Sequence, residues 1–164
     1  MRSRGQVVRP ALEEDLPFLR RMLYEAANRP GTPWPAFDVS MEEARNRRFW
    51  SGWMREGDIG VVAEDNTVPV GAAWIRRFAR EELSPIDDPD VPVLAIGVER
   101  DYRGRGVGGL LMDALIEEAR ASDVPAISLT TGLFNEAAIC LYRRRGFAEV
   151  LRWGEGVQMR LDLR

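Results

Sequence analysis

The residues of this 164-residue chain whose types and spacing best suit chemistry lie between Arg103 and Gly109. The stretch reads RGRGVGG and combines glycines with two arginines. Glycines let a backbone approach an anion closely, and the free N–H groups at the start of a helix attract negative charge. Arginine adds positive charge and forked hydrogen bonding. We therefore predict a phosphate-binding turn rather than a glycine-rich turn with a purely structural purpose.

Two regular elements must position this turn. The almost wholly apolar run at 93–98 is typical of a central strand that is buried on both faces. After the glycines, Val107, Leu111 and Leu115 recur at helical spacing. The order of strand, glycine turn and helix places the free N–H groups of the helix beside the end of the strand.

Two common nucleotide-binding motifs fit this stretch poorly. Gly104, Gly106 and Gly109 satisfy G-x-G-x-x-G, but the first glycine does not follow the strand end at Val98 directly, as a dinucleotide-binding turn requires. The next apolar strand, at 126–130, is not followed by an acidic residue that could bind a ribose. The motif G-x-x-x-x-G-K-[ST] is excluded, because the chain contains no lysine.

The same stretch also fits R/Q-x-x-G-x-G/A, with Arg103, Gly106 and Gly108 at the defined positions. In this motif the chain closely resembles the GNAT superfamily of acetyl-CoA-dependent N-acetyltransferases. The segment from Asn135 to Phe147 is similar to that family's N-x-x-A-x-x-L-Y-x-x-x-G-F segment. The resemblance implies a single-domain α/β fold with a mixed, twisted sheet of about six or seven strands and helices on both faces. It also implies acetyl-CoA as cosubstrate, no metal, and an amine of a small molecule or peptide as acceptor.

The resemblance implies roles for individual residues. Tyr142 would act as the catalytic acid and donate a proton to the departing thiolate, and the Val98 amide would polarise the acetyl carbonyl. Asn135 would hold the pantetheine arm, and helical spacing places it on the face of Tyr142, about 10 Å away. Arg144 would either meet the 3′-phosphate or only complement the helix dipole. The implied cofactor-binding residues are Ile96, Gly97, Val98, Arg103, Gly104, Arg105, Gly106, Val107, Gly108, Gly109, Asn135, Tyr142 and Arg144.

The general base is not identified by the sequence. Some relatives carry a glutamate five residues before the asparagine, where this chain has Thr130. The remaining candidates are Glu64, Glu81, Glu82, Asp88 and Asp90. Ordered water could also take the proton of an amine whose pKa is near 10.4. The run at 81–90, with five carboxylates and no basic residue, is either a solvated loop or a lip that attracts a cationic amine.

Composition narrows the classes of function. The chain has no histidine, which removes imidazole bases, histidine metal sites and histidine-based triads. A net charge of −3 argues against a nucleic-acid partner. There is no long apolar segment and no charged-then-apolar leader, so we expect a cytoplasmic protein with no membrane partner. We expect Cys140 to be a packed thiol rather than a nucleophile.

The other elements follow from periodicity and turn chemistry. We expect residues 1–5 to be a flexible N-terminus and residues 6–164 to form one N-acetyltransferase domain. Ser40 and Glu43 match a capping box, which predicts a helix from there toward Trp53. The other expected elements are a strand at 6–9, a helix from about Asp15, a hairpin at 59–63 and 68–78, and closing strands at 147–151 and 157–163. The last two strands offer an edge for a possible homodimer.

The tryptophans and the overall function leave alternatives open. Trp53 and Trp74 are expected in the core, whereas Trp34, in a loop, could equally line the acceptor side of a cleft. A rival to the enzyme is an acyl-CoA-sensing module that keeps the phosphate cradle without turnover. A nicotinamide-dependent oxidoreductase is a more distant rival.

Overall fold

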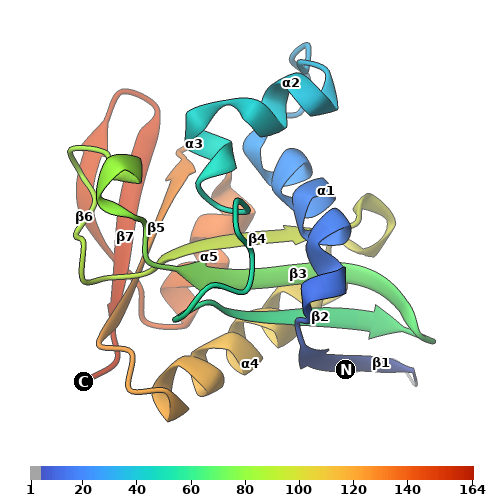
Figure 1. Cartoon of the computed structure of the whole chain (residues 1–164). Coiled ribbons are helices and arrows are strands. Elements are labelled where there is room, and N and C mark those ends of the chain that lie inside the picture. The colour runs from blue at the N-terminus through green and yellow to red at the C-terminus, as the bar shows by residue number, and fades with distance from the viewer. Residues whose placement is uncertain (1–4) are drawn as a thin grey trace.

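The computed structural model describes residues 5–164 as an α/β fold built on one seven-stranded mixed sheet (Figure 1). Residues 1–4, most of the expected flexible N-terminus, lie outside the described residues. The strand order is β1-β2-β3-β4-β5-β7-β6. Helices cover both faces of the sheet, so the expected fold class is confirmed.

The elements match the sequence-based expectations closely. The strands are β1 (Gln6–Pro10), β2 (Ile59–Asp65), β3 (Val68–Arg76), β4 (Val93–Val98), β5 (Ala126–Gly132), β6 (Ala148–Trp153) and β7 (Gly156–Asp162). The α-helices are α1 (Leu16–Ala27), α2 (Phe37–Glu42), α3 (Ala44–Arg47), α4 (Val107–Ala121) and α5 (Glu136–Arg144). Single 3-10 turns are η1 (Glu13–Asp15), η2 (Arg80–Glu82) and η3 (Arg100–Tyr102). Within the described part of the chain, no helix is both long and apolar enough to span a membrane.

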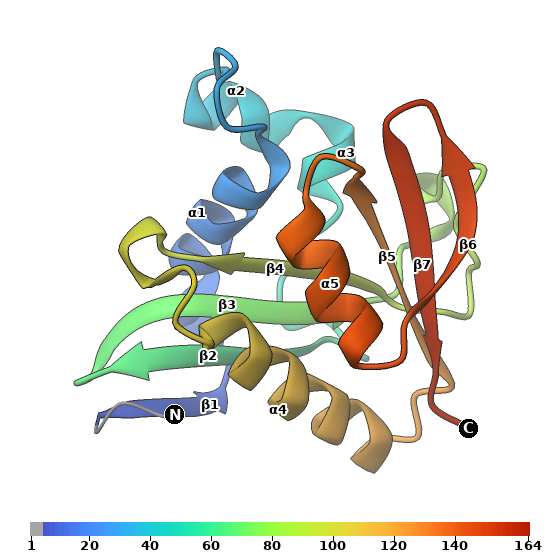
Figure 2. The ribbon, with the colours of Figure 1, turned by 180° about the vertical axis from the view of Figure 1, so that it is seen from behind.

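Two hydrophobic cores lie on opposite faces of the sheet. Helix α1 packs on one face, where Trp53 and Trp74 are 7% and 0% exposed, which confirms their expected place in the core. Helices α4 and α5 pack on the other face (Figure 2), where Leu111, Leu115 and Ile139 are buried. Both sides of β4 are therefore covered, as its apolar sequence requires.

The prediction of one helix running from Ser40 toward Trp53 is wrong. Helix α2 begins earlier, at Phe37, and the chain breaks at Glu43, whose ψ of 133° is extended. Ser40 is buried inside α2, and its carbonyl accepts a hydrogen bond of 2.9 Å from the side chain of the buried Asn46. This side-chain hydrogen bond across the break takes the place of the capping box, and α3 starts as a separate short helix.

Candidate active site

The turn after β4 is open on one side, as a phosphate cradle requires. Gly104 and Gly106 adopt left-handed conformations, with φ of 74° and 83°. A Cβ atom placed on either glycine would have no atom of residues 5–164 within 4 Å apart from its immediate neighbours. The backbone is therefore bare at the two positions where a side chain would block an approaching anion.

The backbone amides of this turn are free. Within the described residues, the N–H groups of residues 104–109 donate no hydrogen bond, and the first bond of the helix runs from Leu110 to Gly106. These amides lie at the N-terminus of the fifteen-residue helix α4, where the helix dipole is positive. The turn thus fits the diphosphate of a nucleotide cofactor, because such a group accepts several hydrogen bonds and carries negative charge.

Gly108 and Gly109 have an additional structural role. A Cβ atom on Gly108 would lie 3.3 Å from Leu141, and one on Gly109 would lie 2.7 Å from the Arg145 guanidinium. Gly109 therefore lets Arg145, at the end of α5, lie against the first turn of α4, whereas at Gly108 a small side chain would need only a slight shift of Leu141. Val107, the first residue of α4, is buried.

The cradle opens onto a free strand edge. Strands β4 and β5 are parallel, but they are paired only at Val93 and Ser128, and beyond that point they diverge (Figure 1). On its other side β4 pairs with β3, and just past the end of β4 the backbone N–H of Glu99 donates to the Val70 carbonyl at 2.8 Å. Because hydrogen bonding alternates along an antiparallel pair, the backbone groups of Ile96 and Val98 point toward the diverging side. An extended ligand can pair with them as an added strand.

Gly97 lies between Ile96 and Val98 but does not face the free edge of β4. Its backbone faces β3, and helix α1 passes so close that a Cβ atom at position 97 would lie 2.5 Å from the Met22 carbonyl oxygen. The structure thus gives Gly97 a packing role.

The arginines near the turn are held in different ways. The Arg103 Nε donates to the Val98 carbonyl at 3.1 Å, and its guanidinium lies 3.6 Å from Glu25. Glu25 also pairs with Arg100 at 3.2 Å. The exposed Arg105 lies over the Tyr102 ring at 5.3 Å. Glu25, on α1, and Glu99, directly after β4, thus belong to this region although sequence patterns did not indicate them.

Helix α5 brings the second motif to the same side. Asn135 is its half-buried N-cap residue, and Tyr142 is buried against Phe147, with ring centroids 5.8 Å apart. Burial raises the pKa of Tyr142 to about 12, so the phenol carries its proton at neutral pH. The hydroxyl has no hydrogen-bond partner within residues 5–164. Since it is not among the fully covered unpartnered atoms there, it retains contact with solvent.

The outer face of α5 carries the remaining predicted residues. Arg144 is exposed, whereas Arg145 pairs with Asp113 at 3.0 Å. Cys140 is also exposed, so the expectation of a packed thiol is wrong. The buried face of α5 is formed by Ile139 and Tyr142, and the thiol points away from that face.

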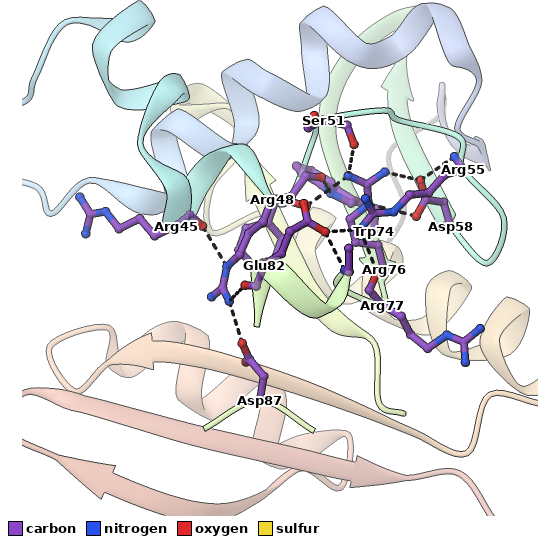
Figure 3. Close-up of polar contacts among 12 residues, drawn as sticks. Arg45, Arg48, Ser51, Arg55, Asp58, Trp74, Arg76, Arg77, Glu82 and Asp87 are labelled. Carbon is purple, nitrogen blue, oxygen red and sulfur yellow. Dashed lines mark hydrogen bonds and ion pairs between the residues drawn. The ribbon is translucent and has the colours of Figure 1, made fainter. Parts of the chain in front are cut away.

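Most of the carboxylates considered as general bases are engaged by arginines. Glu64 pairs with Arg9 at 3.3 Å, Glu82 with Arg55 at 2.8 Å, and Asp88 with Arg160 at 3.5 Å, whereas Glu81 and Asp90 are exposed. Within the acidic run, Asp87 also pairs with Arg48 at 2.7 Å (Figure 3). Two carboxylates of the acidic run, Glu82 and Asp87, therefore form ion pairs with the segment that follows α3.

The loop after α1 walls a hollow beside the turn. The hollow is lined by Pro30, Gly31, Thr32, Trp34, Arg100 and Arg103. Trp34 is half-buried, packs edge-on against Tyr24 with ring centroids 5.3 Å apart, and lies under the Arg100 guanidinium at 5.0 Å. Of the tryptophans considered above, Trp34 is the one that lines an open surface.

Comparisons with known proteins agree with this arrangement. A model of the acetyltransferase (GNAT) family matches residues 20–147. The mycothiol acetyltransferase of Propionibacterium freudenreichii is 33% identical over 112 residues, which make up 68% of this chain and 34% of that protein. The N-alpha-acetyltransferase RimI of Mycobacterium tuberculosis is 31% identical over 118 residues, 72% of this chain and 63% of that protein. The chain thus spans less than two thirds of either relative.

A solved structure shares the fold over nearly the whole chain. It is a putative acetyltransferase from Salmonella typhimurium with its cofactor acetyl-CoA, superimposing with a TM-score of 0.70 at 20% identity over 98% of this chain and 95% of that one. Together with the family match across most of the sequence, this places the chain in the GNAT family of acetyltransferases.

Proposed function

We propose that this protein transfers an acetyl group from acetyl-CoA to the primary amine of a small molecule or peptide. The observation that carries the proposal is the run of free amides at 104–109, on an open-sided glycine turn beside the free edge of β4. Bound acetyl-CoA supplies the acetyl group as a thioester. The residues of the chain supply the binding, the orientation and the proton.

Binding is assigned mainly to backbone groups. The amides of residues 104–109 hold the diphosphate, and Arg103 and Arg105 add charge beside it. The backbone groups of Ile96 and Val98 hold the pantetheine arm in an extended form, and Asn135 fixes it from α5. Arg144, exposed on α5, is available for the 3′-phosphate.

Chemistry is assigned to a backbone amide and a phenol. The free amide of Val98 stabilises negative charge on the acetyl oxygen while the amine attacks. The C–N bond forms, the C–S bond breaks, and Tyr142 donates its hydroxyl proton to the departing sulfur. The proton that the nitrogen loses passes to water, and water returns a proton to the Tyr142 oxygen. The raised pKa of Tyr142 suits this role, because the proton is present at every physiological pH.

Calorimetric titration with acetyl-CoA tests the proposal. We expect wild-type protein to bind, and Gly106→Glu to lose binding because a side chain and a negative charge enter the cradle. Gly52→Glu is the matched control, since Gly52 also has a positive φ of 65° and open space around its Cβ position. Absence of binding by the wild type would contradict the proposal. Binding without turnover across an amine panel would favour an acyl-CoA sensor instead.

A further inference from the structure

Arg20 on α1 is held in an unusual aromatic setting. Its guanidinium carbon lies 4.4 Å from the ring centroid of Trp50 and 5.4 Å from that of Phe37. Phe37 begins α2 and Trp50 follows α3, so three segments meet at this side chain. Stacking on two rings restricts the orientation of the guanidinium group. The terminal N–H groups of Arg20 then remain available to donate hydrogen bonds to an acceptor.

The Arg20 guanidinium has no acceptor. Its Nε is fully covered, and among residues 5–164 it is the only covered side-chain polar atom without a hydrogen-bond partner. The arginines around it are paired: Arg21 binds Glu99, and Arg47, which also lies on Trp50, binds Glu42 at 2.7 Å. Arg20 forms no ion pair with any described residue.

Packing alone does not account for an arginine at this position. A covered donor without an acceptor is unfavourable, and a methionine or leucine would cover the same rings without that penalty. Groups that break the rule of buried-polar pairing in a native structure are concentrated at functional sites. The covered Nε cannot itself meet a ligand, but the terminal nitrogens of the same group are not fully covered and have no acceptor among residues 5–164, so they are the donors that a ligand can reach.

An aromatic wall connects Arg20 with the hollow beside the glycine turn. Tyr24 lies about one helical turn after Arg20 on the same face of α1, so the two side chains are neighbours. From Phe37 a chain of edge-on rings continues through Tyr24 to Trp34, with 5.3 Å between successive centroids, and reaches the hollow beside Arg103. Arg20 thus stands at one end of an aromatic wall whose other end borders the turn.

We infer that Arg20 binds a carboxylate carried by the acceptor, so that the acceptor class is an amine that also bears a carboxylate and an apolar side chain. This inference rests on the proposed function. The two terminal nitrogens of Arg20 donate to the carboxylate oxygens, while Phe37 and Tyr24 contact the apolar part. Arg20 is thereby a specificity-determining residue and takes no part in proton transfer.

The test compares ligands that differ only in the carboxylate. N-acetyl-L-phenylalanine and its amide are titrated into the protein, and tryptophan fluorescence is recorded, because Trp50 lies directly under Arg20. We expect saturable binding of the acid that is on the order of 10- to 100-fold tighter than that of the amide, as for a hydrogen-bonded charge pair. Arg20→Met should remove the difference while still covering the rings.

Arg47→Met is the matched control, because Arg47 also stacks on Trp50 but already has a partner in Glu42. It should keep the preference for the acid. Equal responses to acid and amide, no saturable response to either, or an unchanged preference in Arg20→Met would each overturn the inference. Acetyl-CoA titration of the same variants distinguishes the two failures: Arg20→Met should bind acetyl-CoA like the wild type. Failure of the wild type to bind acetyl-CoA would contradict the proposed function, whereas normal acetyl-CoA binding without a preference for the acid would overturn the role of Arg20 alone.

Discussion

Gly97 on β4 and Met22 on α1 are in direct backbone contact: a Cβ atom at position 97 would lie 2.5 Å from the Met22 carbonyl oxygen. Helix α1 can therefore lie flat across the strand whose neighbouring residues, Ile96 and Val98, face the diverging edge. One glycine thus brings the wall that carries Arg20 and Trp34 close to the predicted acetyl site.

Gly97→Ala should lower the free energy of unfolding by about 1–3 kcal/mol, because the obstructing atom is backbone and cannot rotate away. Urea denaturation measures the change. Gly108→Ala is the control: its Cβ would lie 3.3 Å from the end of the Leu141 side chain, which can rotate, and alanine is the better helix former inside α4, so stability should not fall. If Gly97→Ala had the same unfolding midpoint as the wild type, the Met22 carbonyl of α1 would not lie against position 97 of β4.

Tyr142→Phe should reduce kcat by on the order of 10²- to 10⁴-fold while acetyl-CoA affinity and thermal stability change little. The hydroxyl has no partner within residues 5–164, so its removal breaks no internal bond. Steady-state kinetics and calorimetry on one preparation separate the two effects. Tyr102→Phe removes a hydroxyl that donates to Asp65 at 2.9 Å and should leave kcat near the wild-type value. Turnover by Tyr142→Phe within twofold of wild type would rule out the acid role.

The local parts of the site could be predicted from sequence. Strand β4, the glycine turn and the start of α4 are contiguous, and Asn135 and Tyr142 are related by the period of one helix. Short-range patterns of this kind determine local geometry and therefore survive in the folded protein.

The parts that depend on distant pairing could not be predicted. Glu82 and Asp87 meet Arg55 and Arg48 from another segment, and such pairs leave no periodic signal in the sequence. Glu25 reaches the end of β4 only because α1 crosses that strand.

The dependence of kcat/KM on pH should show no inflection near pH 7 from a general base of the enzyme. Most of the carboxylates considered are held by arginines, and the chain has no histidine. For an acceptor with pKa near 10.4, kcat/KM should rise about tenfold per pH unit from 7 to 9, following the neutral amine. Tyr142, with its pKa raised to about 12, stays protonated over this range and should cause no fall. A plateau that begins near pH 7 would instead reveal a carboxylate or water base.

The segment between α3 and β2 is fastened to β3 by a buried ion pair. The Asp58 carboxylate receives hydrogen bonds of 3.0 and 2.6 Å from Arg76, whose third nitrogen donates to the carbonyls of Arg48 and Ser51 (Figure 3). The two side chains of the pair are 1% and 0% exposed. Every polar group of the pair is therefore satisfied inside the protein.

Asp58→Asn should lower the free energy of unfolding by about 3–5 kcal/mol, because it leaves the buried Arg76 charge without compensation. Chemical denaturation measures the loss. The double variant Asp58→Asn with Arg76→Met should be more stable than Asp58→Asn alone, since the unpaired charge is then gone. Glu149→Gln, which breaks the exposed pair with Arg152, should leave the unfolding midpoint close to that of the wild type. If Asp58→Asn and Glu149→Gln had the same small effect, the pair would not fasten this segment, and the position of Trp50 beneath Arg20 would need another support.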